Sequence, residues 1–371
     1  MPGRLIAPIL AALLTAGLAL SQQAAWQRPF AEGSDTIQKL LLQFDPEAAE
    51  DWLPACRDLL VALPADVQVE IAVADLEDAV ELRRLLNGAT GIRPTIHIVD
   101  TTPTCWTRDR LLVIGGDREP TFWLPRADTM EEPYVFDVVA ATAIAELSNT
   151  PRRSSGLVLE GGDLLCSAGA TFVSVETVRR NAHQFREEQF CEILRSVVGG
   201  RVVVLGGDEV PHEHLDMYVT LLGPKLALVG DPQCGHELLQ HDRAAAGTVI
   251  PDFDVWTADA ADRAAEHYET VARQLQAHGI GVRRLPIVHG ADGRLLTWNN
   301  ALVERRGFRR RVYLPSYGLE HLQLAATRVY TQLGCDVLPI RAAGLAENGG
   351  TVRCITNVVR WHRPTLAAPT R

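Results

Sequence analysis

The chain has 371 residues, of which 47% are hydrophobic and 22% are charged, so extensive disorder is excluded. This length is enough for one large domain or two ordinary ones. The formal net charge of −10 argues against nonspecific nucleic-acid binding, because that function needs a basic surface to displace counterions from phosphates.

The N-terminus has the three-part form of a secretory signal peptide. A basic residue precedes an apolar run from Leu5 to Leu20, and Ala19 and Ser21 are the small residues that a signal peptidase reads. The run is shorter than the roughly 20 residues of a membrane span. We therefore expect residues 1–21 to be a signal peptide and the protein to be exported to the periplasm or the extracellular space. An uncleaved anchor or a helix of the fold is the alternative.

Beyond Trp26, β-like apolar runs alternate with helical patterns. The run from Val67 to Val73 alternates as a half-buried strand does, and Leu76 to Leu86 has the period of an amphipathic helix. The same signals predict strands at residues 94–99, 201–205, 226–229, 282–287 and 311–314, and helices at residues 135–147, 176–198, 260–277 and 319–333, and Val158 precedes a Gly-Gly turn.

Strands separated by helices indicate an α/β or α+β fold. No Pro- or Ser-rich linker divides the chain, so we expect a single domain over residues 26–361 and a loose tail over residues 362–371.

All seven cysteines lie beyond the predicted signal peptide. In an exported protein an odd number is compatible with several disulfides and one free, reactive thiol, and Cys354 is the candidate for the free one. The alternative is that most of these cysteines are small buried hydrophobic side chains.

Four segments concentrate polar side chains beside strand or turn signals, where sites usually lie. Taken singly, each has an ordinary explanation: a packed Trp beside an ion pair, a glycine turn, a histidine cluster able to bind a metal, and a buried cysteine. Their combination in one order is more specific. The segments are CWTRD at residues 105–109, LEGGD at 159–163, HEHLDMY at 212–218 and NGGTVRCITN at 348–357.

In this order the four segments resemble those of the guanidino-group-modifying superfamily, in particular its peptidylarginine deiminase and agmatine deiminase branch. The stretch WNNA at residues 298–301 is similar to the Asn-containing strand that precedes the family's cysteine, and the resemblance spans roughly residues 67–357. It implies an α/β fold, a five-bladed propeller (pentein) of pseudo-symmetric ββαβ-type repeats with the site in its central channel. Close relatives commonly have His before the cysteine, where this chain has Arg353.

The resemblance implies a deiminase that hydrolyses a guanidinium group to a ureido group plus ammonia. It assigns Cys354 as the nucleophile, His214 as the proton-transfer partner and Glu160 as the acceptor that orients the imidazole. It assigns the cation to Asp109 and Asp216, because carboxylates accept parallel N–H bonds from a guanidinium.

Trp106 and Arg108 are further candidate contacts of the substrate. A thiol needs nearby positive charge to ionise, and we expect His214, Arg353 and the bound cation to supply it. The expected partner is a small-molecule or peptidyl guanidino compound, and export favours peptidyl-arginine or extracellular arginine or agmatine. The scheme needs no metal and no organic cofactor, and nucleic acid is not an expected partner.

Three alternatives stay open. An amidinotransferase would use the same covalent intermediate, and a noncatalytic secreted binding protein would keep only the fold. A metal hydrolase would be built on His212, His214 and Asp216 with a further ligand from His236, His241 or His289. In the deiminase interpretation His212 supports His214 or lies on the surface.

Overall fold

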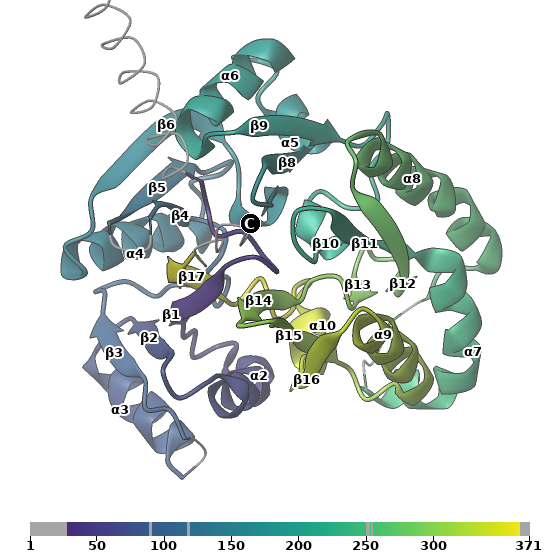
Figure 1. The fold of residues 1–371 in the computed structure, drawn as a ribbon. Coiled ribbons are helices and arrows are strands. Elements are labelled where there is room, and N and C mark those ends of the chain that lie inside the picture. The colour runs from purple at the N-terminus through teal and green to yellow at the C-terminus, as the bar shows by residue number, and fades with distance from the viewer. Residues whose placement is uncertain (1–27, 89–90, 117–118, 250–252, 254, 364–371) are drawn as a thin grey trace, which may run out of the picture.

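The computed structural model describes residues 28–88, 91–116, 119–249, 253 and 255–363. The predicted signal peptide and most of the predicted tail lie outside these residues. Within them, five small mixed sheets follow one another around the molecule, and helices lie on their outer sides (Figure 1). No helix of the described residues is long and apolar enough to cross a bilayer.

The first sheet joins the two ends of the described chain. Its strand order is β17-β1-β2-β3, with β17 antiparallel to β1 and the remaining pairs parallel. Because β17 begins just after Cys354, this pairing holds the C-terminal segment against the beginning of the fold. The elements are β1 (Thr36–Gln43), α2 (Ala49–Ala62), β2 (Gln68–Val73), α3 (Leu76–Leu86), β3 (Thr95–Ile98) and β17 (Asn357–His362).

The other four sheets share one order of elements along the chain. An antiparallel hairpin comes first, one or two helices follow, and a strand then pairs in parallel with the second strand of the hairpin. The second and third sheets contain β4 (Leu112–Gly115), β5 (Pro120–Arg126), α4 (Tyr134–Leu147) and β6 (Arg152–Val158), and then β7 (Leu164–Cys166), β8 (Ala170–Ser174), α5 (Val175–Arg180), α6 (Glu187–Val198) and β9 (Arg201–Leu205).

The fourth sheet adds β13 antiparallel to β12. The fourth and fifth sheets contain β10 (Val219–Leu221), β11 (Leu226–Asp231), α7 (Pro232–Val249), α8 (Ala258–Ala277), β12 (Gly281–His289) and β13 (Leu295–Thr297), and then β14 (Leu302–Arg306), β15 (Arg309–Ser316), α9 (Glu320–Gln332), β16 (Cys335–Arg341) and α10 (Ala343–Glu347). Two 3-10 turns, Gly161–Asp163 and Leu215–Met217, precede β7 and β10.

These sheets confirm the mixed α/β class. The described residues do not form a closed propeller, so the expectation of five blades is confirmed only as far as five small sheets with outer helices. The predicted tail begins too early, because His362 still belongs to β17.

One predicted helix is wrong: residues 176–198 form two helices, α5 and α6. The side chain of Asn181 accepts a hydrogen bond from the Val158 backbone N (2.8 Å) and donates to the carbonyls of Val158 and Thr177 (2.6 and 2.8 Å). Asn side chains that bind the backbone in this way compete with the helix. The chain therefore turns after α5, and α6 begins only at Glu187.

Candidate active site

A pocket of about 560 Å³ lies where loops from all five sheets meet. Five of the seven predicted site residues line it, and they lie in loops that follow β3, β6, β9 and α10. Parallel strands of one sheet have their carboxyl ends at the same edge of that sheet. The loops that line the pocket lie at these edges, so they converge although they are far apart in the sequence. The five are Trp106, Asp109, Glu160, His214 and Cys354.

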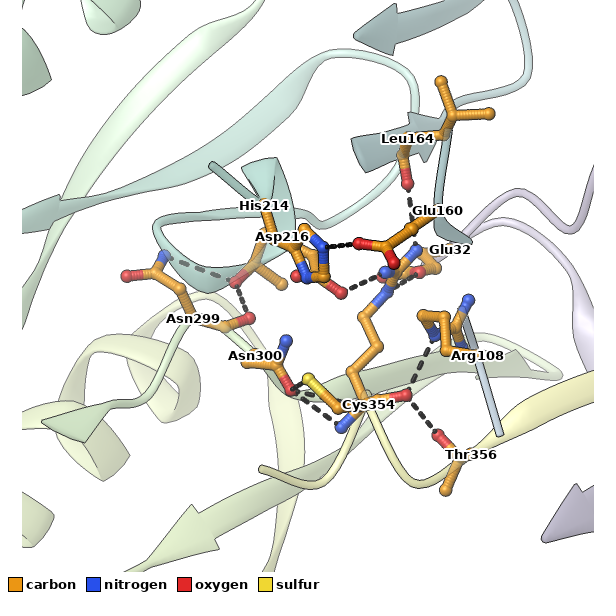
Figure 2. A network of polar contacts seen from close by, with 12 residues as sticks. Glu32, Arg108, Glu160, Leu164, His214, Asp216, Asn299, Asn300, Cys354 and Thr356 are labelled. Carbon is orange, nitrogen blue, oxygen red and sulfur yellow. Dashed lines mark hydrogen bonds and ion pairs between the residues drawn. The ribbon is translucent and has the colours of Figure 1, made fainter. Parts of the chain in front are cut away.

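Glu160 anchors the imidazole of His214. Its Oε2 lies 2.6 Å from His214 Nε2 (Figure 2), and its Oε1 lies 2.7 Å from Arg110 Nη1. Arg180 adds a second cation at 3.9 Å. Burial raises the pKa of Glu160, but the hydrogen bond and charge of His214 and the charges of both arginines outweigh it and lower that pKa to about 2. Glu160 is therefore a fixed anion that holds one ring nitrogen.

His214 is held in its protonated form. Burial lowers the pKa of His214, but the hydrogen bond to Glu160 and the charges of Asp109 and Asp163 raise it to about 10. With Nε2 bound to Glu160, Nδ1 is the nitrogen left for proton transfer. That atom lies against Gly162, where a side-chain Cβ would come within 2.6 Å of it.

Cys354 is buried at the pocket and is not part of a disulfide. Its Sγ lies 3.4 Å from Asn300 Oδ1, which also accepts the backbone N–H of Cys354 at 3.3 Å (Figure 2). Burial and the charges of Asp216 and Asp109 raise the pKa of Cys354 well above its usual value. All seven cysteines lie within the described residues and all are free, so the structure favours the interpretation without disulfides.

Two carboxylates at the site each keep a buried oxygen with no hydrogen-bond partner among the described residues. These atoms are Oδ1 of Asp109 and Oδ1 of Asp216, whereas Oδ2 of Asp216 accepts from Arg353 Nη1 at 2.5 Å. Burial raises the pKa of Asp109 to about 8, against the charge of His214. Unpartnered buried oxygens are costly, and a ligand rich in N–H donors would satisfy both.

Trp106 lines the pocket and packs over Gly350 so closely that a Cβ there would overlap its ring. Arg108 departs from its predicted role as a substrate contact. It lines a separate cavity of about 30 Å³ and donates from Nε to the Arg353 carbonyl (2.9 Å; Figure 2), while its backbone N donates to the Cys354 carbonyl (3.1 Å). Arg108 therefore supports the loop that carries Cys354 and does not reach the pocket.

The ligand set of the metal-hydrolase alternative is not assembled. His212 Nδ1 accepts the backbone N–H of His214 at 3.0 Å, and burial beside His214 lowers the pKa of His212 to about 4. His289 bonds the Tyr268 hydroxyl and stacks on Trp256, and His236 and His241 lie on α7. Nowhere in the described ranges do three His, Cys, Asp or Glu side chains gather around one metal position.

The sequence interpretation missed three residues with clear roles. Arg110 and Arg180 bracket Glu160, and Glu32 pairs with the side chain of Arg353. Arg110 directly follows Asp109, so the motif at residues 105–109 could have pointed to it. Neither Arg180 nor Glu32 carries a local signal, since each is a single charged residue whose partners lie far away in the sequence.

Replacing Gly162 with alanine is expected to lower kcat about a hundredfold with little loss of fold. The new Cβ would lie 2.6 Å from His214 Nδ1 and 3.2 Å from Asp216 Oδ1, so both side chains must shift, and displacements of this size cost about two orders of magnitude in rate. Steady-state kinetics and a thermal melt check this. The exposed Gly169→Ala variant lies outside the pocket, has no neighbours within 4 Å of the added Cβ and no positive φ, and serves as the glycine control. Unchanged kcat in Gly162→Ala would contradict the placement of the reacting nitrogen.

No family model and no curated protein matches this sequence significantly. Solved structures do match its fold. Agmatine deiminase of Enterococcus faecalis superposes with a TM-score of 0.68 over 91% of this chain and 96% of its own, at 15% identity. Agmatine deiminase of C. jejuni gives 0.66 over 92% and 97%, at 14% identity. The amidinotransferase SxtG of Microseira wollei gives 0.54 over 92% and 99%, at 13% identity. The chain therefore shares the fold of these two agmatine deiminases and of this amidinotransferase.

Proposed function

We propose that this protein is a deiminase that hydrolyses the guanidinium group of an arginine-type compound to a ureido product plus ammonia, with Cys354 as the covalent nucleophile. One observation carries the proposal. The buried thiol lines the pocket with a Glu160-bound imidazole and with Asp109, while Asp216 lies beside that imidazole at Gly162, outside the pocket lining. Each of the two aspartates keeps a buried oxygen without a partner among the described residues. A flat cation with several N–H donors is the ligand class that satisfies those oxygens.

The charges around the pocket also suit a cation. Five carboxylates are buried or largely buried there, against four arginines and the protonated His214. These charges balance when all five carboxylates are ionised, so loss of the Cys354 thiol proton leaves one negative charge, which a bound guanidinium offsets. The carboxylates are Glu32, Asp109, Glu160, Asp163 and Asp216, and the arginines are Arg108, Arg110, Arg180 and Arg353.

The proposed reaction begins with binding of the guanidinium against Asp109 and Asp216. The positive charge of the substrate favours the thiolate, and the thiol proton leaves to solvent. The sulfur then attacks the central carbon, and His214 gives its proton to the departing nitrogen, which leaves as ammonia. A thiouronium remains on Cys354.

Neutral His214 next takes a proton from water while the oxygen of that water bonds to the same carbon. The carbon–sulfur bond breaks, which returns the thiolate and releases the ureido product and a proton. Glu160 keeps the ring oriented through both steps, because it holds Nε2 while Nδ1 exchanges the proton.

The substrate class rests on the same geometry together with the named activities of the matching structures, which are agmatine deiminases. Asp128 and Glu213 are exposed carboxylates on the pocket lining. They favour a substrate with a second positive charge, such as agmatine, over one that presents a free carboxylate. Peptidyl-arginine and free arginine are the competing members of this class.

A colorimetric assay for ureido product tests the proposal on agmatine, free arginine and an arginyl peptide, with wild-type protein and a Cys354→Ala blank. We expect product from at least one compound and an equal rate after treatment with a chelator. If no guanidino compound gives product, the proposal fails and the noncatalytic alternative gains. A chelator-sensitive rate would instead favour the metal hydrolase.

Amidinotransfer is a second candidate, because an amidinotransferase also shares the fold and such enzymes use the same thiouronium. The two reactions differ in what attacks that intermediate. Adding glycine or another primary amine would divert product from the ureido compound to a new guanidino compound if transfer occurs. An unchanged ureido yield supports hydrolysis.

We also propose that residues 1–21 direct export, that the chain from residue 26 to the end of β17 forms one domain, and that the five sheets are pseudo-symmetric repeats. The signal-peptide pattern and the repeated hairpin–helix–strand order support these statements. N-terminal sequencing of protein recovered from the periplasm or medium should begin at Gln22. Recovery only from the cytoplasm with Met1 retained would contradict export.

A further inference from the structure

The side chain of Arg353 lies between two carboxylates that are far apart in the sequence, Glu32 near the N-terminus and Asp216 in the middle of the chain. Its Nε lies 2.6 Å from Glu32 Oε1 and its Nη1 lies 2.5 Å from Asp216 Oδ2, while Nη2 donates to the Leu164 carbonyl at 3.2 Å. The residue is 4% exposed and does not line the pocket above Cys354. The sequence interpretation expected Arg353 to supply positive charge to the thiol, and the structure instead directs that charge to Glu32 and Asp216.

The backbone of Arg353 is fixed as well. Its N–H donates to Asn300 Oδ1 at 2.9 Å, and its carbonyl accepts from Arg108 Nε at 2.9 Å. The same Asn300 oxygen receives the backbone N–H of Cys354 (Figure 2). Main chain and side chain together therefore tie the nucleophile's loop to the carboxylate that faces it.

This arrangement makes the two oxygens of Asp216 different. Arg353 occupies Oδ2, whereas Oδ1 is buried, has no partner among the described residues, and lies beside the same glycine as His214 Nδ1. With one oxygen fixed by a short charge-assisted bond, the carboxylate cannot rotate freely. It presents one defined oxygen toward the reacting groups.

We propose that Arg353 and Glu32 form a positioning pair that orients Asp216 so that its Oδ1 accepts an N–H of the substrate guanidinium. This inference rests on the proposed function. An arginine suits the task because its planar fork can reach two carboxylates and a carbonyl from separate nitrogens, which a lysine ammonium on a flexible stem cannot do in the same geometry.

Glu32 has a distinct part in this pair. Alone, Arg353 would offset the charge of Asp216 and weaken its attraction for a cation. With Glu32 on the other edge of the guanidinium, the three side chains keep one net negative charge beside the pocket. Glu32 thereby lets one carboxylate be both anchored and attractive to the substrate.

The test compares Arg353→Lys, Arg353→Met, Glu32→Gln and the double variant Glu32→Gln/Arg353→Met. Each is assayed with agmatine, free arginine and an arginyl peptide. Arg353→Met should lower kcat/KM about a hundredfold with KM rising more than kcat falls, and Arg353→Lys should recover about tenfold of this loss. Glu32→Gln should raise KM about tenfold and leave kcat nearly unchanged.

Thermal melts separate positioning from folding. The double variant removes both members of a buried ion pair, so it should melt closer to wild type than Arg353→Met does, yet it should keep the raised KM of Arg353→Met. Arg309→Met, an exposed arginine paired with Asp336, is the matched control and should have wild-type kinetics.

The outcomes distinguish failure of the Arg353–Glu32 positioning pair from failure of the proposed function. If wild type hydrolyses a guanidino compound and the folded Arg353→Met and Glu32→Gln variants keep its KM, the positioning pair is refuted while the proposed function stands. The same holds if KM returns to the wild-type value in the double variant, because the effect then followed stability alone. Absence of product from all three compounds with wild type refutes the proposed function itself.

Discussion

Replacing Cys354 with alanine is expected to lower kcat by about four orders of magnitude or more while the protein stays folded. The sulfur forms the bond to the substrate carbon in the proposed reaction. Without this nucleophile the covalent thiouronium intermediate cannot form. Cys354 is small, and among the described residues its sulfur has a hydrogen bond only with Asn300, so the cavity left by the change costs little stability. The ureido assay and a thermal melt measure the two effects.

Cys335→Ala is the matched control, since that cysteine is equally buried but lies on β16 away from the pocket. It should keep wild-type kcat. A peptide map after treatment with iodoacetamide gives an independent readout. Agmatine should slow alkylation of Cys354, whereas the half-buried Cys191 and Cys234 should react at the same rate with and without it. More than trace activity in Cys354→Ala would refute the nucleophile.

The elements that the sequence predicted best are those with a clean period. The pattern at residues 76–86 gives α3 at its full length, and RVVVL gives β9. Elements without a period were missed. The first strand, β1, has the continuous apolar run Leu40 to Leu42 because it is covered on both faces, and α2 contains Pro54, which reads as a helix breaker.

The candidate site also has a part that the sequence predicted and a part that it did not. Motif order correctly grouped Cys354, His214, Glu160 and Asp109, which all line the pocket in segments between the sheets. Motif order did not predict the direction of the side chains. Arg108 lines the small cavity behind the loop that carries Cys354, and Arg353 pairs with Glu32, which is 321 residues away in the chain. Such partners are chosen by packing between sheets and leave no trace in local sequence.

Replacing Asp109 with asparagine is expected to lower kcat/KM several hundredfold, chiefly through KM. Asparagine keeps the shape but removes the negative charge, and losing one member of a buried charge pair costs roughly 2–5 kcal/mol. The effect should depend on pH. Burial raises the pKa of Asp109 to about 8, so wild-type kcat/KM should fall as the pH falls below 8, and the difference between wild type and variant should narrow there. An unchanged kcat/KM would remove Asp109 from the site.

The same substitution should stabilise the protein without substrate at alkaline pH. A carboxyl with a folded-state pKa near 8 and an unfolded-state pKa of about 4 binds its proton more tightly when folded. The free energy of unfolding therefore decreases as pH rises from about 4 to 8, and the full cost, on the order of a few kcal/mol, is present above 8. Asp109→Asn removes that cost, so its Tm should exceed the wild-type Tm at pH 9 and match it near pH 4. The half-exposed Asp336, which pairs with Arg309 on the surface, provides the control: Asp336→Asn should show no such difference. Equal Tm values at pH 9 would mean that Asp109 is not held in a desolvated site waiting for a cation.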